Sequence, residues 1–77
     1  MSTALTLQVN GKPQTLDGLS SPTLLPEVIA GLALKHDRIA VEHNGEIVPR
    51  SKWNQAQVSD GDRLEIVHFV GGGSLSR

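Results

Sequence analysis

The chain has 77 residues, enough for one small domain, with no cysteine and a formal net charge of −1 at pH 7. The lack of cysteine excludes disulfides, a thiolate nucleophile and a thiolate metal site, and the nearly balanced charge, with no basic stripe, argues against a nucleic acid partner. No stretch could span a bilayer and the first residues do not resemble a signal peptide, so we expect a cytoplasmic protein without a membrane partner.

The start of the chain predicts a β-hairpin. Residues 5–9 alternate apolar and polar side chains, as in a strand with one face on a core. Asn10-Gly11 then indicates a tight turn, because both residues tolerate a positive φ. Leu16 lies on the expected return strand, and Pro13 is tolerated near the start of that strand or at a sheet edge.

One helix is expected after the hairpin. Thr23 is predicted to cap it, and Pro26 would fall in the first turn, where a missing N–H breaks no intrahelical hydrogen bond. The apolar face of this helix follows the i, i+3, i+4, i+7 spacing: Leu25, Val28, Ile29 and Leu32.

Shorter elements fill the second half of the chain. Residues 39–43 and 46–48 predict two strands joined by a second tight turn at Asn44-Gly45. Residues 51–55 suit a single helical turn with Trp53 as its apolar anchor. Aspartates and glycine in residues 59–62 are typical of a turn, which we favour there over a metal or acid–base pair.

The final strand is expected over residues 64–70 and runs directly into Gly71, Gly72 and Gly73, before residues 74–77. Glycine has no Cβ and wide conformational freedom, so such a tail can enter a channel too narrow for other residues. A tail of this kind, next to a domain with little other chemistry, indicates that the tail itself is the reactive part.

Strand parity divides the side chains of this last strand between two faces. Leu64 and Ile66 are expected on the core face, and Val67 and Phe69 on the solvated face marked by Glu65. Two apolar side chains in register beside a reactive tail are interpreted as a patch that docks a partner.

The order of these elements predicts an α+β fold, a mixed sheet of four to five strands curled around one helix, which is the β-grasp or ubiquitin-like architecture. Pairing the opening hairpin with the last strand in the middle of the sheet requires a long crossover, which the helical segment supplies. A ferredoxin-like sandwich is the alternative, but it normally needs a second full helix. We expect the domain over residues 1–70 and a flexible glycine-rich tail over residues 71–77.

The stretch from Asn44 to Trp53, the Asp60-Gly61-Asp62 turn and the terminal VHFVGGG segment closely resemble the sulfur carrier proteins of thiamine biosynthesis. The resemblance implies a β-grasp fold and a C-terminal glycine, here Gly73 preceded by Gly72, that carries sulfur as a thiocarboxylate. It also implies three partners: a ThiF-type adenylyltransferase that activates the glycine with ATP, a sulfur donor protein, and a ThiG-type thiazole synthase that accepts the sulfur.

Such a carrier is a co-substrate and not an enzyme, so no catalytic residue is expected in the chain. No bound cofactor is expected either, because the glycines open no helix and form no phosphate loop, which leaves ATP to the partner. The three histidines lack ligand spacing and predict no metal site: His36, His43 and His68.

One departure from the family is that Gly73 is followed by four residues, so its carboxyl group is held in a peptide bond to Ser74. Either a processing protease removes residues 74–77, or the chain as written is inactive, or those residues derive from how the chain was made. We expect that a protease removes residues 74–77.

Three other functions fit the same pattern. The small subunit of molybdopterin synthase uses similar terminal chemistry with another acceptor. A β-grasp binding or regulatory module would use the glycines only as a linker. A ubiquitin-like modifier would be joined to lysines through Gly73.

Overall fold

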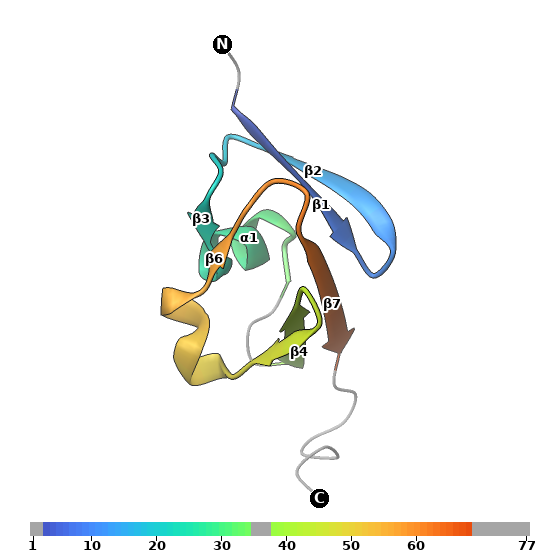
Figure 1. Ribbon diagram of the computed structural model, residues 1–77, viewed down its shortest axis with the longest axis vertical. Helices are drawn as coiled ribbons and strands as arrows, with labels where there is room; N and C mark the ends of the chain where they lie inside the picture. The colour runs from blue at the N-terminus through green and yellow to red at the C-terminus, as the bar shows by residue number, and fades with distance from the viewer. Residues whose placement is uncertain (1–2, 35–37, 69–77) are drawn as a thin grey trace, which may run out of the picture.

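The computed structural model describes residues 3–34 and 38–68, which form a mixed five-stranded sheet packed on one α-helix (Figure 1). The expectations for Phe69, Gly71, Gly72 and Gly73, and for the boundary between domain and tail at residue 70, lie outside the described residues. In chain order the elements are β1 (Ala4–Val9), β2 (Lys12–Asp17), β3 (Thr23–Leu24), α1 (Leu25–Gly31), β4 (Ile39–His43), β5 (Glu46–Val48), the 3-10 helix η2 (Arg50–Gln55), β6 (Gln57–Val58) and β7 (Arg63–His68).

The large sheet has the strand order β2-β1-β7-β4-β5, and the pairing of β1 with β7 is parallel while its other pairings are antiparallel. The last strand therefore lies in the middle of the sheet, beside the first, as the sequence predicts for a β-grasp fold. The strands β3 and β6 form a separate two-stranded sheet beside α1 (Figure 1).

Both predicted tight turns are confirmed. Asn10 and Gly11 have φ values of 52° and 82°, and Asn44 and Gly45 have φ values of 52° and 89°. A two-residue hairpin turn with positive φ at both positions matches the right-handed twist of its strands, and asparagine followed by glycine is the pair that adopts it most readily.

The helix begins one residue later than predicted. Pro26 lies in the first turn as expected, but Leu24, and not Thr23, is the N-cap residue. The reason is that Thr23 pairs with Val58 and Leu24 with Gln57, so the two residues before α1 belong to a strand. The prediction of Thr23 as the cap is therefore wrong.

The core lies between the large sheet, α1 and η2. Trp53 is buried, and its Nε1–H donates a 3.0 Å hydrogen bond to the carbonyl oxygen of Val48, which confirms its role as the anchor of η2. The other buried apolar side chains among the described residues are Leu5, Leu7, Leu16, Leu25, Val28, Ile29, Ile39, Val41, Val58, Leu64 and Ile66. None of the described helices is both long and apolar enough to cross a membrane.

Candidate functional site

The expected reactive tail follows β7, so β7 is the element that fixes where the tail begins. In the sheet it lies between β1 and β4, and its last described residue is His68 (Figure 1). Leu64 and Ile66 are 0% and 6% exposed, which confirms the predicted core face of this strand.

Asn10 attaches the first hairpin to β7. Its Oδ1 accepts a 2.7 Å hydrogen bond from the Ile66 N–H, and its Nδ2 donates a 3.1 Å bond to the Ile66 carbonyl oxygen. The main-chain N–H of Asn10 also donates to the Leu64 carbonyl at 2.9 Å. The side-chain amide thus takes the place of a further backbone unit and continues the β1–β7 pairing past the end of β1.

Asn44 contacts β7 from the other side, with one bond from its main chain and one to its side-chain oxygen. Its main-chain N–H donates to the Arg63 carbonyl at 2.8 Å, and its Oδ1 accepts from the Arg63 N–H at 2.9 Å. From the sequence, both asparagines were predicted only as turn residues. Their bonds to the β7 backbone could have been suspected from the side-chain amide, which offers a donor and an acceptor as a peptide unit does.

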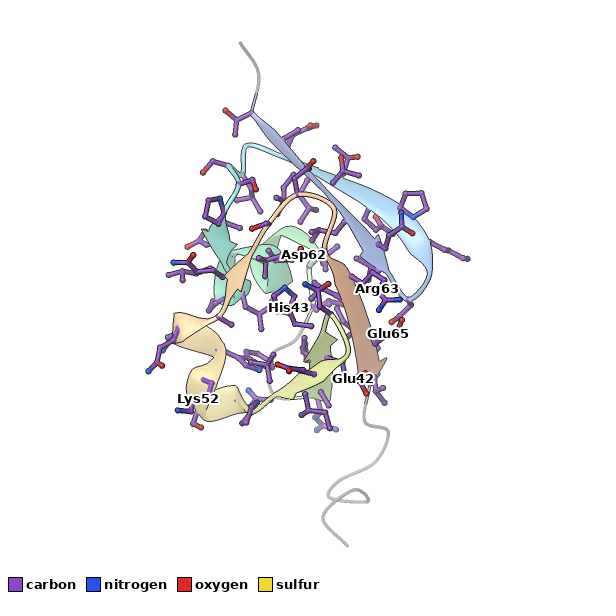
Figure 2. The ribbon with its side chains drawn as sticks, viewed as in Figure 1. Glu42, His43, Lys52, Asp62, Arg63 and Glu65 are labelled. Atoms are coloured by element: carbon purple, nitrogen blue, oxygen red, sulfur yellow. The ribbon has the colours of Figure 1, made fainter. Side chains whose placement is uncertain are left out.

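The loop between β6 and β7 contains a turn at residues 59–62, as predicted, closed by a 3.0 Å hydrogen bond from the Asp62 N–H to the Ser59 carbonyl oxygen. Asp62 Oδ2 accepts a 2.8 Å hydrogen bond from the Ser59 N–H and lies 2.7 Å from His43 Nε2 (Figure 2). Asp60 Oδ1 accepts a 2.7 Å bond from the Thr6 N–H. Within residues 3–34 and 38–68, no three histidine, aspartate or glutamate side chains lie together as a metal site would require.

The environment of Asp62 favours its ionised form. Burial alone raises the pKa of this carboxyl group, but the Ser59 N–H and the His43 and Asn44 side chains outweigh burial and hold the pKa below its ordinary value. Asp62 and His43 thus join the β6–β7 loop to the end of β4. This link was not predicted from the sequence, where His43 was interpreted only as a residue at the end of a strand.

Val67 lies on the face of the sheet that points away from α1, and it is 56% exposed. The antiparallel register places Val67 opposite Ala40, and Glu65 opposite Glu42. On the other side of β4, Glu42 is opposite Ile47. The structure therefore places one of the two predicted docking residues on an open surface, and Phe69 lies beyond the described residues.

Comparison with known proteins finds one matching family and several relatives of this chain. The sequence model of the ThiS family matches residues 7–73. A thiazole synthase of Paramagnetospirillum magneticum is 44% identical over 69 residues, covering 88% of this chain. The sulfur carrier protein ThiS of Bacillus subtilis is 34% identical over 67 residues, covering 87% of this chain and 98% of its own length.

The lengths covered differ between these relatives. The chain spans only 20% of the length of the P. magneticum thiazole synthase, and 20% of a second one from Magnetococcus marinus. The crystal structure of the thiamine biosynthesis protein ThiS from Geobacter metallireducens is 37% identical, with a TM-score of 0.75, and the match covers 90% of this chain and 100% of that one. With a family match over most of its residues and the same β-grasp fold as a solved relative, the chain belongs to the ThiS family.

Proposed function

We propose that the chain is a sulfur carrier protein of thiamine biosynthesis and that the C-terminal carboxyl group of Gly73 carries the sulfur. The observation that carries this proposal is the family match, which ends at Gly73, the last residue of the glycine run. The match to the B. subtilis carrier supports it, because it covers almost the whole of that small protein.

The chemistry requires little from the domain itself. A carboxylate is a poor acyl donor, so its oxygen first attacks the α-phosphorus of ATP and releases pyrophosphate, which leaves an acyl-adenylate. Hydrosulfide derived from the sulfur donor protein then attacks the carbonyl carbon, and the bond from that carbon to the AMP oxygen breaks. AMP leaves and the thiocarboxylate remains, with no change of oxidation state at carbon or sulfur. Both steps take place in the active site of an adenylyltransferase, which supplies ATP.

The domain supplies a fixed starting point for the tail. β7 is paired on both sides, and the amides of Asn10 and Asn44 add hydrogen bonds to its backbone. Three extended residues span at most about 10 Å, so Gly71 to Gly73 could carry the carboxyl group into a narrow pocket while the domain stays outside. Val67, together with Phe69, would contact the partner beside that pocket.

Activation requires a free carboxyl group at Gly73. In the sequence this group forms the peptide bond to Ser74, so the carrying form would end at Gly73 after residues 74–77 are removed. A processing protease is the proposed agent.

A thiazole synthase is the proposed acceptor of the sulfur. Two relatives named thiazole synthase contain a segment similar to this chain within a protein about five times as long, since the match covers 20% of each. A carrier segment held in the same polypeptide as the synthase favours this acceptor over the molybdopterin route.

The test is a mass measurement on the chain truncated after Gly73, incubated with a ThiF-type adenylyltransferase, ATP and a sulfur donor. We expect the intact mass to increase by one exchange of oxygen for sulfur. The full chain of 77 residues is the matched control and should not change. If the truncated chain is folded and binds the adenylyltransferase but is never adenylated, the proposed function is wrong.

A further inference from the structure

The outward face of β5, β4 and β7 carries a group of side chains that we call the acidic-apolar face: Ala40, Glu42, Ile47, Glu65 and Val67. One row across the strands reads Ile47, Glu42, Glu65, and the next contains Ala40 and Val67. Figure 2 labels the two glutamates on the neighbouring strands β4 and β7. Their position opposite each other follows from the register and could not be read from spacing along the chain.

The two glutamates form an unfavourable pair in the free protein. Directly opposite residues of an antiparallel pair have Cβ atoms about 5 Å apart, and like charges placed there are destabilising. In the part of the chain that the structure describes, neither Glu42 nor Glu65 forms an ion pair or a side-chain hydrogen bond. Arg63 is on the same face two residues before Glu65, but it is not ion-paired with it within those same residues.

Exposed apolar side chains lie on either side of this pair. Ile47 is 72% exposed and Val67 is 56% exposed, and only Leu24 joins them among the large exposed apolar side chains of residues 3–34 and 38–68. Ile47 and Ala40 also line an open, mostly apolar groove of about 230 Å³ between β4, β5 and η2. The face therefore combines two adjacent glutamates, which form no ion pair among the described residues, with apolar contact area.

We propose that the acidic-apolar face binds a basic surface of the thiazole synthase, with a lysine or arginine side chain placed between Glu42 and Glu65 and apolar side chains against Val67 and Ile47. A cation there removes the like-charge repulsion, and complementary charge also increases the rate of encounter. This inference rests on the proposed function, because it assigns a partner to the surface beside the sulfur-carrying tail.

β7 carries the acidic-apolar face and leads into the tail, so any partner that receives the tail also meets this face. The choice of the synthase over the adenylyltransferase therefore rests on the relatives. In two relatives a segment similar to this chain is part of a longer protein named thiazole synthase, so the segment and the synthase share one polypeptide. This favours the synthase as the partner that binds the face.

The test uses the chain ending at Gly73 and the thiazole synthase of the same organism. Glu42→Gln and Glu65→Gln each remove one charge with little change of shape, and Glu27→Gln is the matched control, since Glu27 is an exposed glutamate on α1, away from this face. At about 0.05 M salt, where charges are weakly screened, we expect each variant of the face to weaken binding about fivefold, while the control binds like the parent chain. The loss should shrink at about 0.5 M salt.

A second measurement separates docking from a structural role. Because each substitution relieves the repulsion between the glutamates, Glu42→Gln and Glu65→Gln should each raise the thermal midpoint of the free domain, by about 1 to 5 °C. Weaker binding by a more stable domain is not expected of a residue that only supports the fold.

Two results would overturn the proposal: unchanged affinity of the Glu42→Gln/Glu65→Gln double variant for the synthase, or a loss of affinity confined to the adenylyltransferase. Measuring thiocarboxylate formation on the same proteins separates this proposal from the proposed function. If the parent chain forms the thiocarboxylate and the double variant still binds the synthase equally well, only the docking surface is wrong. If the parent chain never forms it, the sulfur carrier function is wrong.

Discussion

Replacing Asn10 with glycine tests whether its side chain fixes β7 in the sheet. Glycine keeps the conformational freedom that the φ of 52° requires, so the turn itself is not strained by the change. What is lost is the pair of hydrogen bonds to Ile66, of 2.7 and 3.1 Å, both partly buried. At about 0.5–1.5 kcal/mol for each bond, the free energy of unfolding should fall by roughly 1–3 kcal/mol.

For a domain of this size, 1 kcal/mol corresponds to a change of about 4–8 °C in the thermal midpoint, so Asn10→Gly should lower the midpoint by roughly 5–20 °C. Asn44→Gly is the matched control. It also replaces the first residue of an Asn-Gly turn, with the same φ of 52°, but it removes only one bond to the β7 backbone, that from the Arg63 N–H. We expect it to lower the midpoint about half as much.

The assay combines thermal unfolding followed by circular dichroism with amide hydrogen exchange. Exchange at the Ile66 N–H should become faster in Asn10→Gly, because this amide loses its acceptor, and should change much less in Asn44→Gly. Equal midpoints for the two variants, together with unchanged protection of Ile66, would refute the role assigned to Asn10.

Three further predictions concern other parts of the chain. The pKa of Asp62 in the folded state lies below its ordinary value of 3.8, so its ionised carboxylate stabilises the fold fully above pH 3.8. This stabilisation is lost as the pH falls through the lowered pKa. In urea unfolding at successive pH values, the free energy of unfolding should therefore fall less on acidification in Asp62→Asn than in the parent chain. Trp53→Ala removes a buried ring and should lower the free energy of unfolding by about 3–5 kcal/mol, measured by urea unfolding, and a loss below about 1 kcal/mol would contradict its place in the core. Phe69→Asp should weaken partner binding with little change in the thermal midpoint, whereas a large drop in the midpoint would show that Phe69 belongs to the core.

Much of the fold could be predicted because local chemistry and periodicity agree with the tertiary structure. The alternation of residues 5–9, the two Asn-Gly pairs and the parity of the last strand each depend on near neighbours in the chain. The cap at Thr23 was wrong because a two-residue strand pairing with β6 overrides the local preference for a helix start.

The side-chain contacts around β7 depend on which strands become neighbours in the sheet. The bonds from Asn10 to Ile66 join residues 56 positions apart, and the Glu42–Glu65 pair exists only because β4 and β7 meet in one register. No periodicity within a single element contains that information. The sequence could therefore indicate the proposed sulfur-carrying end and the exposed Val67, but not the charged surface beside Val67.

The central position of β7 also has a mechanical consequence. A pull on the chain beyond His68 acts along the axis of β7, whereas the hydrogen bonds to its antiparallel neighbour β4 run across that axis. Such a force stretches these bonds together, in shear, and the bonds to β1 resist at the same time. An edge strand such as β2 or β5, pulled in the same way, would be held by the hydrogen bonds of one neighbour only. An enzyme that holds and draws in the tail would thus be pulling on the strand of this sheet that is hardest to extract, so the domain can remain folded while its end is gripped.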